Sequence, residues 1–187
     1  MNTQLEEYNL SPINEAILQE RLLHVSELHH NIEATKQVFQ QYIQLGNQMC
    51  KNIQDLAHTF ESCTGGDSSL KPIVTLLNVF QNAMTSHYRQ VEDKVISPLT
   101  KFVNTEIKKA ESDGNEATKQ YDDFSKILDG YVSVPSKKRT EKSFEGKENQ
   151  LLFQNWMAIN KNFTFVRSLD LVERKKTIEI TAAVCFI

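Results

Sequence analysis

The residues that could carry out catalysis or hold a metal do not combine into a site. His29 and His30 are adjacent, so on a helix they point about 100° apart and cannot share a metal ion as a pair four residues apart would. Gly65-Gly66 lacks the spacing and the lysine of a phosphate-binding loop. Nothing in the sequence pairs Asp122-Asp123 into an acid–base couple. We therefore predict that the chain is not an enzyme and uses no cofactor or metal.

Regularly spaced basic residues are the remaining candidates, because they could bind an extended anion. Five lysines recur along one stretch, and at 100° per residue they lie within roughly 40° of one another on a helix. Acidic residues are nearly absent from this stripe, with Asp122 only at its edge, although the chain carries a net charge of −3. A basic turn follows at the far end of the same predicted helix. The candidate binding residues are Lys94, Lys101, Lys108, Lys119, Lys126, Lys137, Lys138, Arg139 and Lys142.

An anionic phospholipid membrane is the partner that best suits this stripe. A lysine near such a bilayer contributes about 1 kcal/mol, so the five lysines give about 5 kcal/mol and the turn adds about 3 or 4. Binding of this strength is weak and sensitive to salt, and two chains in a rigid dimer would make it useful. Nucleic acid is not the predicted partner, because no aromatic or base-reading residues interleave with the lysines. The alternative, that the lysines only solvate a long helix, stays open.

Long helices are predicted to position the stripe. Apolar residues stepping by three and four predict a first helix over 12–62, after a lead-in at 1–11, and a second over 70–129. Pro98 predicts a kink in the second helix, and Gly46 a bend or a close helix approach in the first. The heptad phase passes through the weak helix formers at 112–115, so we expect the second helix to continue there. The first seam comprises Val25, Leu28, Ile32, Thr35, Phe39, Tyr42, Gly46, Met49, Ile53, Leu56 and Phe60. The second comprises Ile107, Ala110, Gly114, Ala117, Tyr121, Phe124, Leu128 and Tyr131.

A loop and a third helix complete the predicted domain. The loop spans 130–146 and carries the basic turn, and the third helix spans 147–187. Apolar residues continue to the last position without a stop signal, so we expect a truncated helix and a longer natural chain. The sequence therefore predicts one all-α domain, an elongated antiparallel three-helix coiled-coil bundle that oligomerises. The apolar face of the third helix comprises Leu152, Trp156, Ile159, Phe163 and Val166.

The composition agrees with long helices that face water. Charged residues make up 24% of the 187 residues and aromatic residues 9%. No apolar run approaches the roughly 20 residues needed to span a bilayer, and no signal-peptide pattern opens the chain. Cys50, Cys63 and Cys185 are widely spaced and suit unpaired thiols in a reducing cytosol. We therefore expect a cytoplasmic protein that binds membranes peripherally.

Several short segments, taken in order, resemble a known family. They are the Ser11-Pro12 that opens the first helix, the Asn-x-x-Asp-Leu-Ala of residues 52–57, the Pro-Leu-x-x-Phe of residues 98–102, and the segments 168–172 and 175–180. Together they resemble the BAR domain, specifically the branch at the N-terminus of ACAP/centaurin-type Arf GTPase-activating proteins and of oligophrenin and GRAF proteins. The resemblance covers nearly the whole chain. The sequence departs from the family where two turns of the third helix are missing between Val172 and Lys175, so the third helix is shorter.

The resemblance implies a protomer of three helices that pairs antiparallel into a six-helix, crescent-shaped homodimer. The basic concave face and the distal tips of such dimers lie on curved, anionic membranes. The implied tip residues here are Lys137, Lys138, Arg139 and Lys142, with Lys108, Lys119 and Lys126 on the second helix. The expected function is a module that senses or induces curvature, at the N-terminus of a larger trafficking or GTPase-regulating protein. The alternative is a helical scaffold that binds a protein partner such as a small GTPase without touching membrane.

Overall fold

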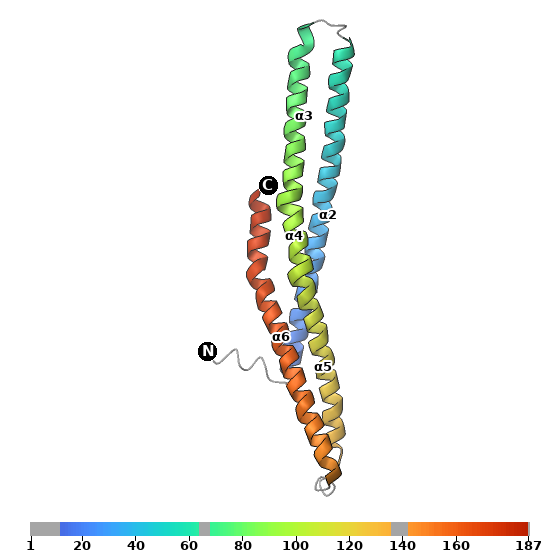
Figure 1. Ribbon diagram of the computed structural model, residues 1–187, viewed down its shortest axis with the longest axis vertical. Coiled ribbons are helices and arrows are strands. Elements are labelled where there is room, and N and C mark those ends of the chain that lie inside the picture. Colours follow the sequence, from blue (N-terminus) through green and yellow to red (C-terminus); the bar gives the residue numbers. More distant parts are fainter. Residues whose placement is uncertain (1–11, 64–67, 136–141, 187) are drawn as a thin grey trace. The chain divides into compact units, whose positions relative to one another are not determined.

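The computed structural model describes residues 12–63, 68–135 and 142–186, and within these ranges every long element is a helix (Figure 1). Helix α2 runs over Pro12–Cys63 and α6 over Lys142–Phe186. Between them lie the 3₁₀ turn η1 (Ser68–Leu70) and a second long helix without a break, in the order α3 (Lys71–Val91), η2 (Glu92–Ile96), α4 (Ser97–Phe102), η3 (Val103–Ile107) and α5 (Lys108–Val132). The predicted all-α fold with three long helices is confirmed.

The connection between the second and third helices is shorter than the predicted loop at 130–146. Helix α5 continues to Val132, and α6 begins at Lys142 instead of near Lys147. The side chain of Phe144 is buried, and its ring packs on that of Tyr131 with the centroids 4.8 Å apart. This apolar contact extends α6 toward its N-terminus, through Gly146, in spite of the low helix propensity of glycine.

Two compact units make up the chain. Residues 1–29 and 103–176 form the first, which we call the three-helix unit because it contains the start of α2, α5 and most of α6. Residues 30–102 and 177–187 form the second, which we call the hairpin unit because α2 and α3 pack side by side within it.

Two π-helical turns flank Pro98, and every fourth residue from Val91 to Ile107 is buried across them. Ile107 follows Val91 by 16 residues, and in an unbroken α-helix the two would point about 160° apart at 100° per residue. Both side chains are nevertheless buried, as is Leu99 between them. Each of the segments η2 and η3 accommodates one extra residue in its turn, and the N–H of Ser97 donates to the carbonyl of Glu92, five residues back. The second helix thus continues through Pro98 with a wide turn on each side, and the kink at Pro98 stays a prediction.

Polar contacts fix the antiparallel register of α6 against η3 and α5 in the three-helix unit. As the residue number rises toward the C-terminus of α5, the number of the partner on α6 falls, as expected for helices that run in opposite directions. Only polar or charged side chains take part, so a shift in register would leave several of them unpaired. The pairs are Glu106 with Lys175, Asp113 with Ser168, Glu116 with Lys161 at 3.8 Å, and Gln120 with Gln154 at 2.9 Å.

Helix α5 runs without a break through residues 112–115, as the heptad phase predicted. Gly114 is buried there because two side chains occupy the space beside it. A Cβ atom at this position would lie 2.8 Å from Leu22 Cδ1 and 2.9 Å from Phe165 Cε2. Glycine therefore allows α2 and α6 to approach α5 closely, and the apparent loop signal in the sequence is a packing requirement.

The packed face of α2 in the hairpin unit differs from the predicted seam. Positions spaced by seven from Ile32 to Phe60 are buried or half-buried, as expected. The companion positions lie four residues after these, and they are Lys36, Ile43, Cys50 and Ala57. The predicted companions, three residues after, point away from the core, and they are Thr35, Tyr42, Met49 and Leu56. Both series have heptad spacing, so spacing alone did not separate them.

Candidate membrane-binding surface

Three of the candidate lysines lie on α5, and all three are exposed. Lys108 Nζ donates a hydrogen bond to Asn104 Oδ1 at 2.8 Å, and Lys126 Nζ lies 3.6 Å from Asp123 Oδ1. Lys119 lies between them on the same face, opposite the buried Ala110 and Ala117. The three-helix unit therefore presents these ammonium groups to solvent, where they are available to an anionic surface.

Carboxylates interrupt this row of lysines. Asp122 and Asp129 are exposed at positions that continue the same face of α5, three residues after Lys119 and Lys126 respectively. The sequence had predicted a stripe almost free of acid, with Asp122 only at its edge. The positive charge of α5 is thus smaller than the lysine count suggests, because each carboxylate offsets part of the attraction to an anion.

Lys94 and Lys101 belong to the hairpin unit. Lys94 lies in η2 and Lys101 in α4, and both side chains are exposed. The remaining candidates, Lys137, Lys138 and Arg139, lie outside the described residues. Lys142 is the first residue of α6. The structure therefore places five of the nine candidate side chains on the surface.

His29 and His87 each contact a side chain of a neighbouring helix. His29 Nδ1 lies 2.9 Å from Glu111 Oε1, and His87 Nε2 lies 3.1 Å from the hydroxyl of Tyr42. Within residues 12–63, 68–135 and 142–186, no cluster of three or more histidine, cysteine, aspartate or glutamate side chains could hold a metal ion. Over the same ranges, no helix has the length and apolar character needed to cross a membrane.

Burial shifts the pKa of two tyrosines. The pKa of Tyr88 is raised above 10.0 mainly by desolvation, with Tyr42 as a second cause. The pKa of Tyr121 is raised mainly by desolvation and then by the carboxylate of Glu15. Both phenols therefore stay neutral over the physiological range and act as packing groups.

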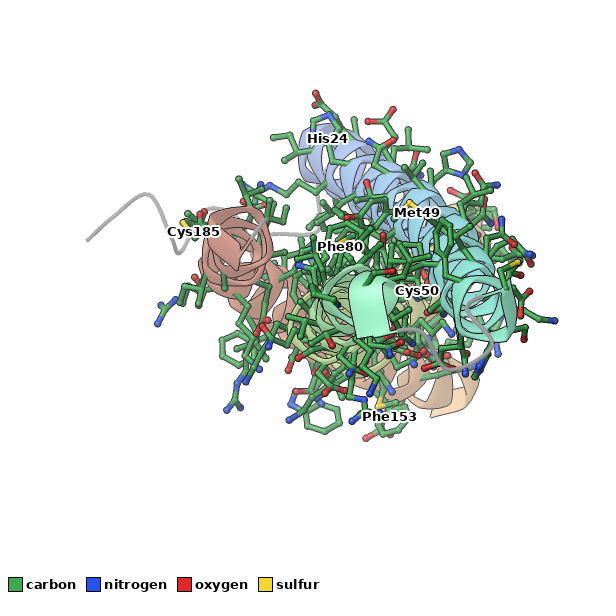
Figure 2. The ribbon with its side chains drawn as sticks, turned by 90° about the horizontal axis from the view of Figure 1, so that it is seen from above. His24, Met49, Cys50, Phe80, Phe153 and Cys185 are labelled. Carbon is green, nitrogen blue, oxygen red and sulfur yellow. The ribbon has the colours of Figure 1, made fainter. Side chains whose placement is uncertain are left out.

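An open apolar face on the hairpin unit was missed by the sequence analysis. Tyr42 on α2 and His87 on α3 contact each other, which places the exposed rows of the two helices on one side. Figure 2 shows Met49 and Phe80 on this side, whereas Cys50 lies between the helices. We call this surface the hairpin face. It comprises Val38, Tyr42, Leu45, Met49 and Leu56 on α2 with Ile73, Leu76, Val79 and Phe80 on α3.

The sequence did carry a signal for this face. Residues 37–50 and 72–88 contain no aspartate, glutamate, lysine or arginine, although a quarter of the chain is charged. A solvent-facing helix surface without charges over several turns is typical of an interface. The sequence predicted an oligomer, but the predicted seams of these helices did not include Val38, Leu45, Leu76 or Val79.

Three long helices with a lengthwise-packed core and an uncovered apolar face define a helical coiled-coil module of the kind that associates through its long faces. Comparison with known families identifies it further. Residues 4–185 match the family model described as the BAR domain of APPL family, and the chain belongs to this family. BAR domains generally dimerise and act on membrane curvature, and they are generally not enzymes. A comparison with curated proteins gave no match.

Proposed function

We propose that this chain is a homodimeric module that binds anionic membranes and senses or induces their curvature. We further propose that it belongs to a larger trafficking or GTPase-regulating protein of the ACAP/centaurin, oligophrenin and GRAF branch. Membership of the BAR family is the observation that carries the general proposal. The proposed branch depends on the resemblance of residues 52–57, 98–102 and 168–180. The family model that matches the chain is instead described as the BAR domain of APPL family.

The hairpin face supports dimerisation through a two-fold axis. Leu45 is 72% exposed and Leu76 is 68% exposed, so most of their apolar surface is open to water. Full burial of such a side chain contributes about 1.5 to 3 kcal/mol. A second copy would cover this face with the same uncharged surface, and no like charges would oppose each other. Self-pairing is therefore the simplest way to bury it.

Exposed basic residues support contact with an anionic membrane. The ammonium groups of Lys94, Lys101, Lys108, Lys119 and Lys126 face solvent. The basic turn at 137–142 adds four basic residues and one acidic residue, Glu141. Asp122 and Asp129 weaken the contribution of α5. The turn is therefore expected to contribute a larger share of the binding than the stripe, and dimerisation would double both.

Co-sedimentation with phosphatidylserine-containing vesicles at low and high salt tests the membrane proposal. Changing Lys137, Lys138, Arg139 and Lys142 to Glu should remove most of the bound fraction, and high salt should weaken binding of the unmodified chain. Changing the exposed Lys51 and Lys71 to Glu is the control for charge alone, and it should have a small effect. Equal binding by the turn variant and the unmodified chain would refute the assignment of the turn.

The mass in solution tests the dimer separately. Leu45→Asp together with Met49→Asp places four charges at a two-fold interface and should give a monomer. Leu23→Asp is the matched control, because Leu23 is also exposed but lies in the three-helix unit. A monomeric unmodified chain, or a variant that stays dimeric, would refute pairing through the hairpin face.

The exposed carboxylates on α5 favour a second candidate function. A row that mixes lysines with Asp122 and Asp129 suits a protein surface better than a lipid surface, because a protein can place bases opposite the carboxylates. The chain would then be a scaffold that binds a partner such as a small GTPase. This alternative predicts no sedimentation with vesicles at any salt concentration and retention of a small GTPase in a pulldown.

A further inference from the structure

A second open apolar row runs along α6 in the three-helix unit. The sequence assigned this row to the core, but α6 packs through the neighbouring face, which carries Ala158, Phe165 and Leu169. Trp156 is 59% exposed, and the other members are exposed as well. The row follows the heptad spacing of one helix face. It comprises Leu152, Trp156, Ile159 and Phe163.

This row leads into a hollow between α2 and α6. The hollow has a volume of about 560 Å³, and its apolar lining includes Val25, Phe163, Val166 and Leu169. Arg21 and His24 line it from α2. Ile17 is exposed on the same face of α2, because it precedes these two residues by four and seven positions. The start of α2 and Phe163 thus line one hollow, and Leu152, Trp156 and Ile159 continue from Phe163 as an exposed apolar row on α6. We call the hollow together with this row the α2–α6 groove.

Three guanidinium groups and two carboxylates line the hollow of the α2–α6 groove. Asp170 and Glu173 also line the hollow, but Arg174 lies 2.9 Å from the first and Lys176 lies 2.6 Å from the second. Arg167 is exposed, and it forms no ion pair with any residue in the described ranges. Arg21 adds a second guanidinium on the opposite wall. An occupant with carboxylates beside its apolar face would complement this rim.

We propose that the α2–α6 groove binds an acidic amphipathic helix of a protein partner. The row from Leu152 to Val166 covers about 21 Å at 1.5 Å per residue, which is the length of about four helical turns. A helix with apolar residues at positions i, i+3, i+4 and i+7 lays its apolar face into such a groove. Arg21 and Arg167, one on each wall, would pair with carboxylates along the two sides of that face.

The other possible occupants suit the groove less well. A bilayer accepts apolar side chains that project outward, whereas Phe163 and Val166 line a concave surface between two helices. A second copy of the chain on this groove would bring the same basic rim opposite itself, so that Arg167 faced arginine. The groove lies in the three-helix unit and the hairpin face in the other, so its occupant does not depend on the proposed dimer.

Trp156 is the only tryptophan of the chain, so its fluorescence reports directly on the proposed contact. The probe is a synthetic helical peptide of about 18 residues, or five turns, with leucines on one face and glutamates beside them. A matched peptide with lysine in place of each glutamate is the control. We expect the acidic peptide to shift the Trp156 emission to shorter wavelength and to protect it from acrylamide quenching. The basic peptide should do neither.

Charge reversal of the rim makes the test specific. Arg21→Glu together with Arg167→Glu should weaken binding of the acidic peptide by about tenfold, equal to about 1.4 kcal/mol. The same variant should gain affinity for the basic peptide, which a misfolded protein would not do. Lys109→Glu is the matched control, because Lys109 is exposed on α5 and does not line the hollow. It should bind the acidic peptide as the unmodified chain does.

Four results would overturn the proposal. The first is that neither peptide changes the Trp156 emission. The second is that both peptides bind equally and that the variant with Arg21→Glu and Arg167→Glu binds them as the unmodified chain does. Alternatively, Trp156 becomes shielded as the concentration of the chain alone rises, which would identify a second copy as the occupant. Finally, vesicles of phosphatidylcholine shift the emission while the acidic peptide does not, which would identify lipid as the occupant.

Discussion

Gly46→Ala should destabilise the hairpin unit, although alanine is the better helix former. Gly46 lies inside α2 and is buried. An added Cβ would lie 2.1 Å from Tyr88 Cζ and 2.4 to 2.5 Å from two further ring carbons. Ordinary carbon contacts have a separation of about 3.5 to 4.0 Å, so the ring would have to move by more than about 1 Å. The close helix approach predicted at Gly46 is thus present and specific to one ring.

The size of the effect follows from two opposing contributions. Replacing glycine by alanine in a helix interior gains about 1 kcal/mol. Forcing a methyl group into a packed core costs about 1 to 3 kcal/mol, and the short separation from the ring places the cost at the upper end of this range. Tyr88 is only 3% exposed, and its ring also contacts those of Tyr42 and His87, so it has little room to shift. We expect a net loss of about 2 kcal/mol.

Urea unfolding followed by far-ultraviolet circular dichroism measures this loss. Gly146→Ala is the matched control, because Gly146 lies inside α6 with no atom within 4 Å of its added Cβ. The control should become more stable by about 1 kcal/mol. In a Tyr88→Leu background, Gly46→Ala should cost much less, because the clash is with the ring. A Gly46→Ala chain as stable as the Gly146→Ala chain would refute the reasoning.

Three further predictions concern stability. Asn162 is 4% exposed and its Oδ1 has no hydrogen-bond partner among the described residues. Asn162→Leu should therefore raise the free energy of unfolding by about 1 kcal/mol. A lower free energy of unfolding in urea would contradict this. Desolvation, and then Tyr42, raise the pKa of Tyr88 above its unfolded value of 10.0, so this contribution to stability is present below pH 10 and is lost as the pH rises through the folded pKa. Ultraviolet titration should therefore show two phenols ionising late, those of Tyr88 and Tyr121, and Tyr88→Phe should remove one of them. Glu106→Lys should destabilise the three-helix unit by about 1 kcal/mol, and adding Lys175→Glu should restore part of it, whereas additive losses would show that the two residues are not coupled.

Much of the fold followed from the spacing of apolar residues. Helix α5 continues through residues 112–115 because its packed seam stays in phase there, and phase proved a better guide than the weak propensities of Ser112, Gly114 and Asn115. The second helix also continues through Pro98. The π-helical turns on either side of it were not predicted. Apolar residues recur at every fourth position from Val91 to Ile107, and this spacing is longer than the mean of about 3.5 residues in a heptad, so it could have indicated the turns.

The choice of packed face was harder to predict. In α2, residues three and four positions after each seam residue are both apolar at several points, as with Met49 and Cys50. In α6, Ile159 and Phe163 are apolar, but the neighbouring Ala158 and Asn162 are the buried residues. A heptad pattern determines the position of the packed stripe around the helix only to within about one residue, which corresponds to 100°. The helices that pack against it decide which of the neighbouring stripes becomes the core. In α2 half of the predicted seam is therefore packed within the chain, and in α6 the packed face lies beside the predicted apolar row.

Charge distinguishes the hairpin face from the α2–α6 groove. All of the hairpin face except Leu56 lies within stretches that contain no aspartate, glutamate, lysine or arginine, so a copy of itself can cover this part without unpaired charges. The α2–α6 groove has arginines on both walls, so the same arrangement there would bury like charges against each other. One surface therefore suits self-association and the other suits a different, acidic partner. If so, dimerisation and partner binding are separable, and Leu45→Asp with Met49→Asp should abolish the first while leaving the fluorescence response of Trp156 to the acidic peptide intact.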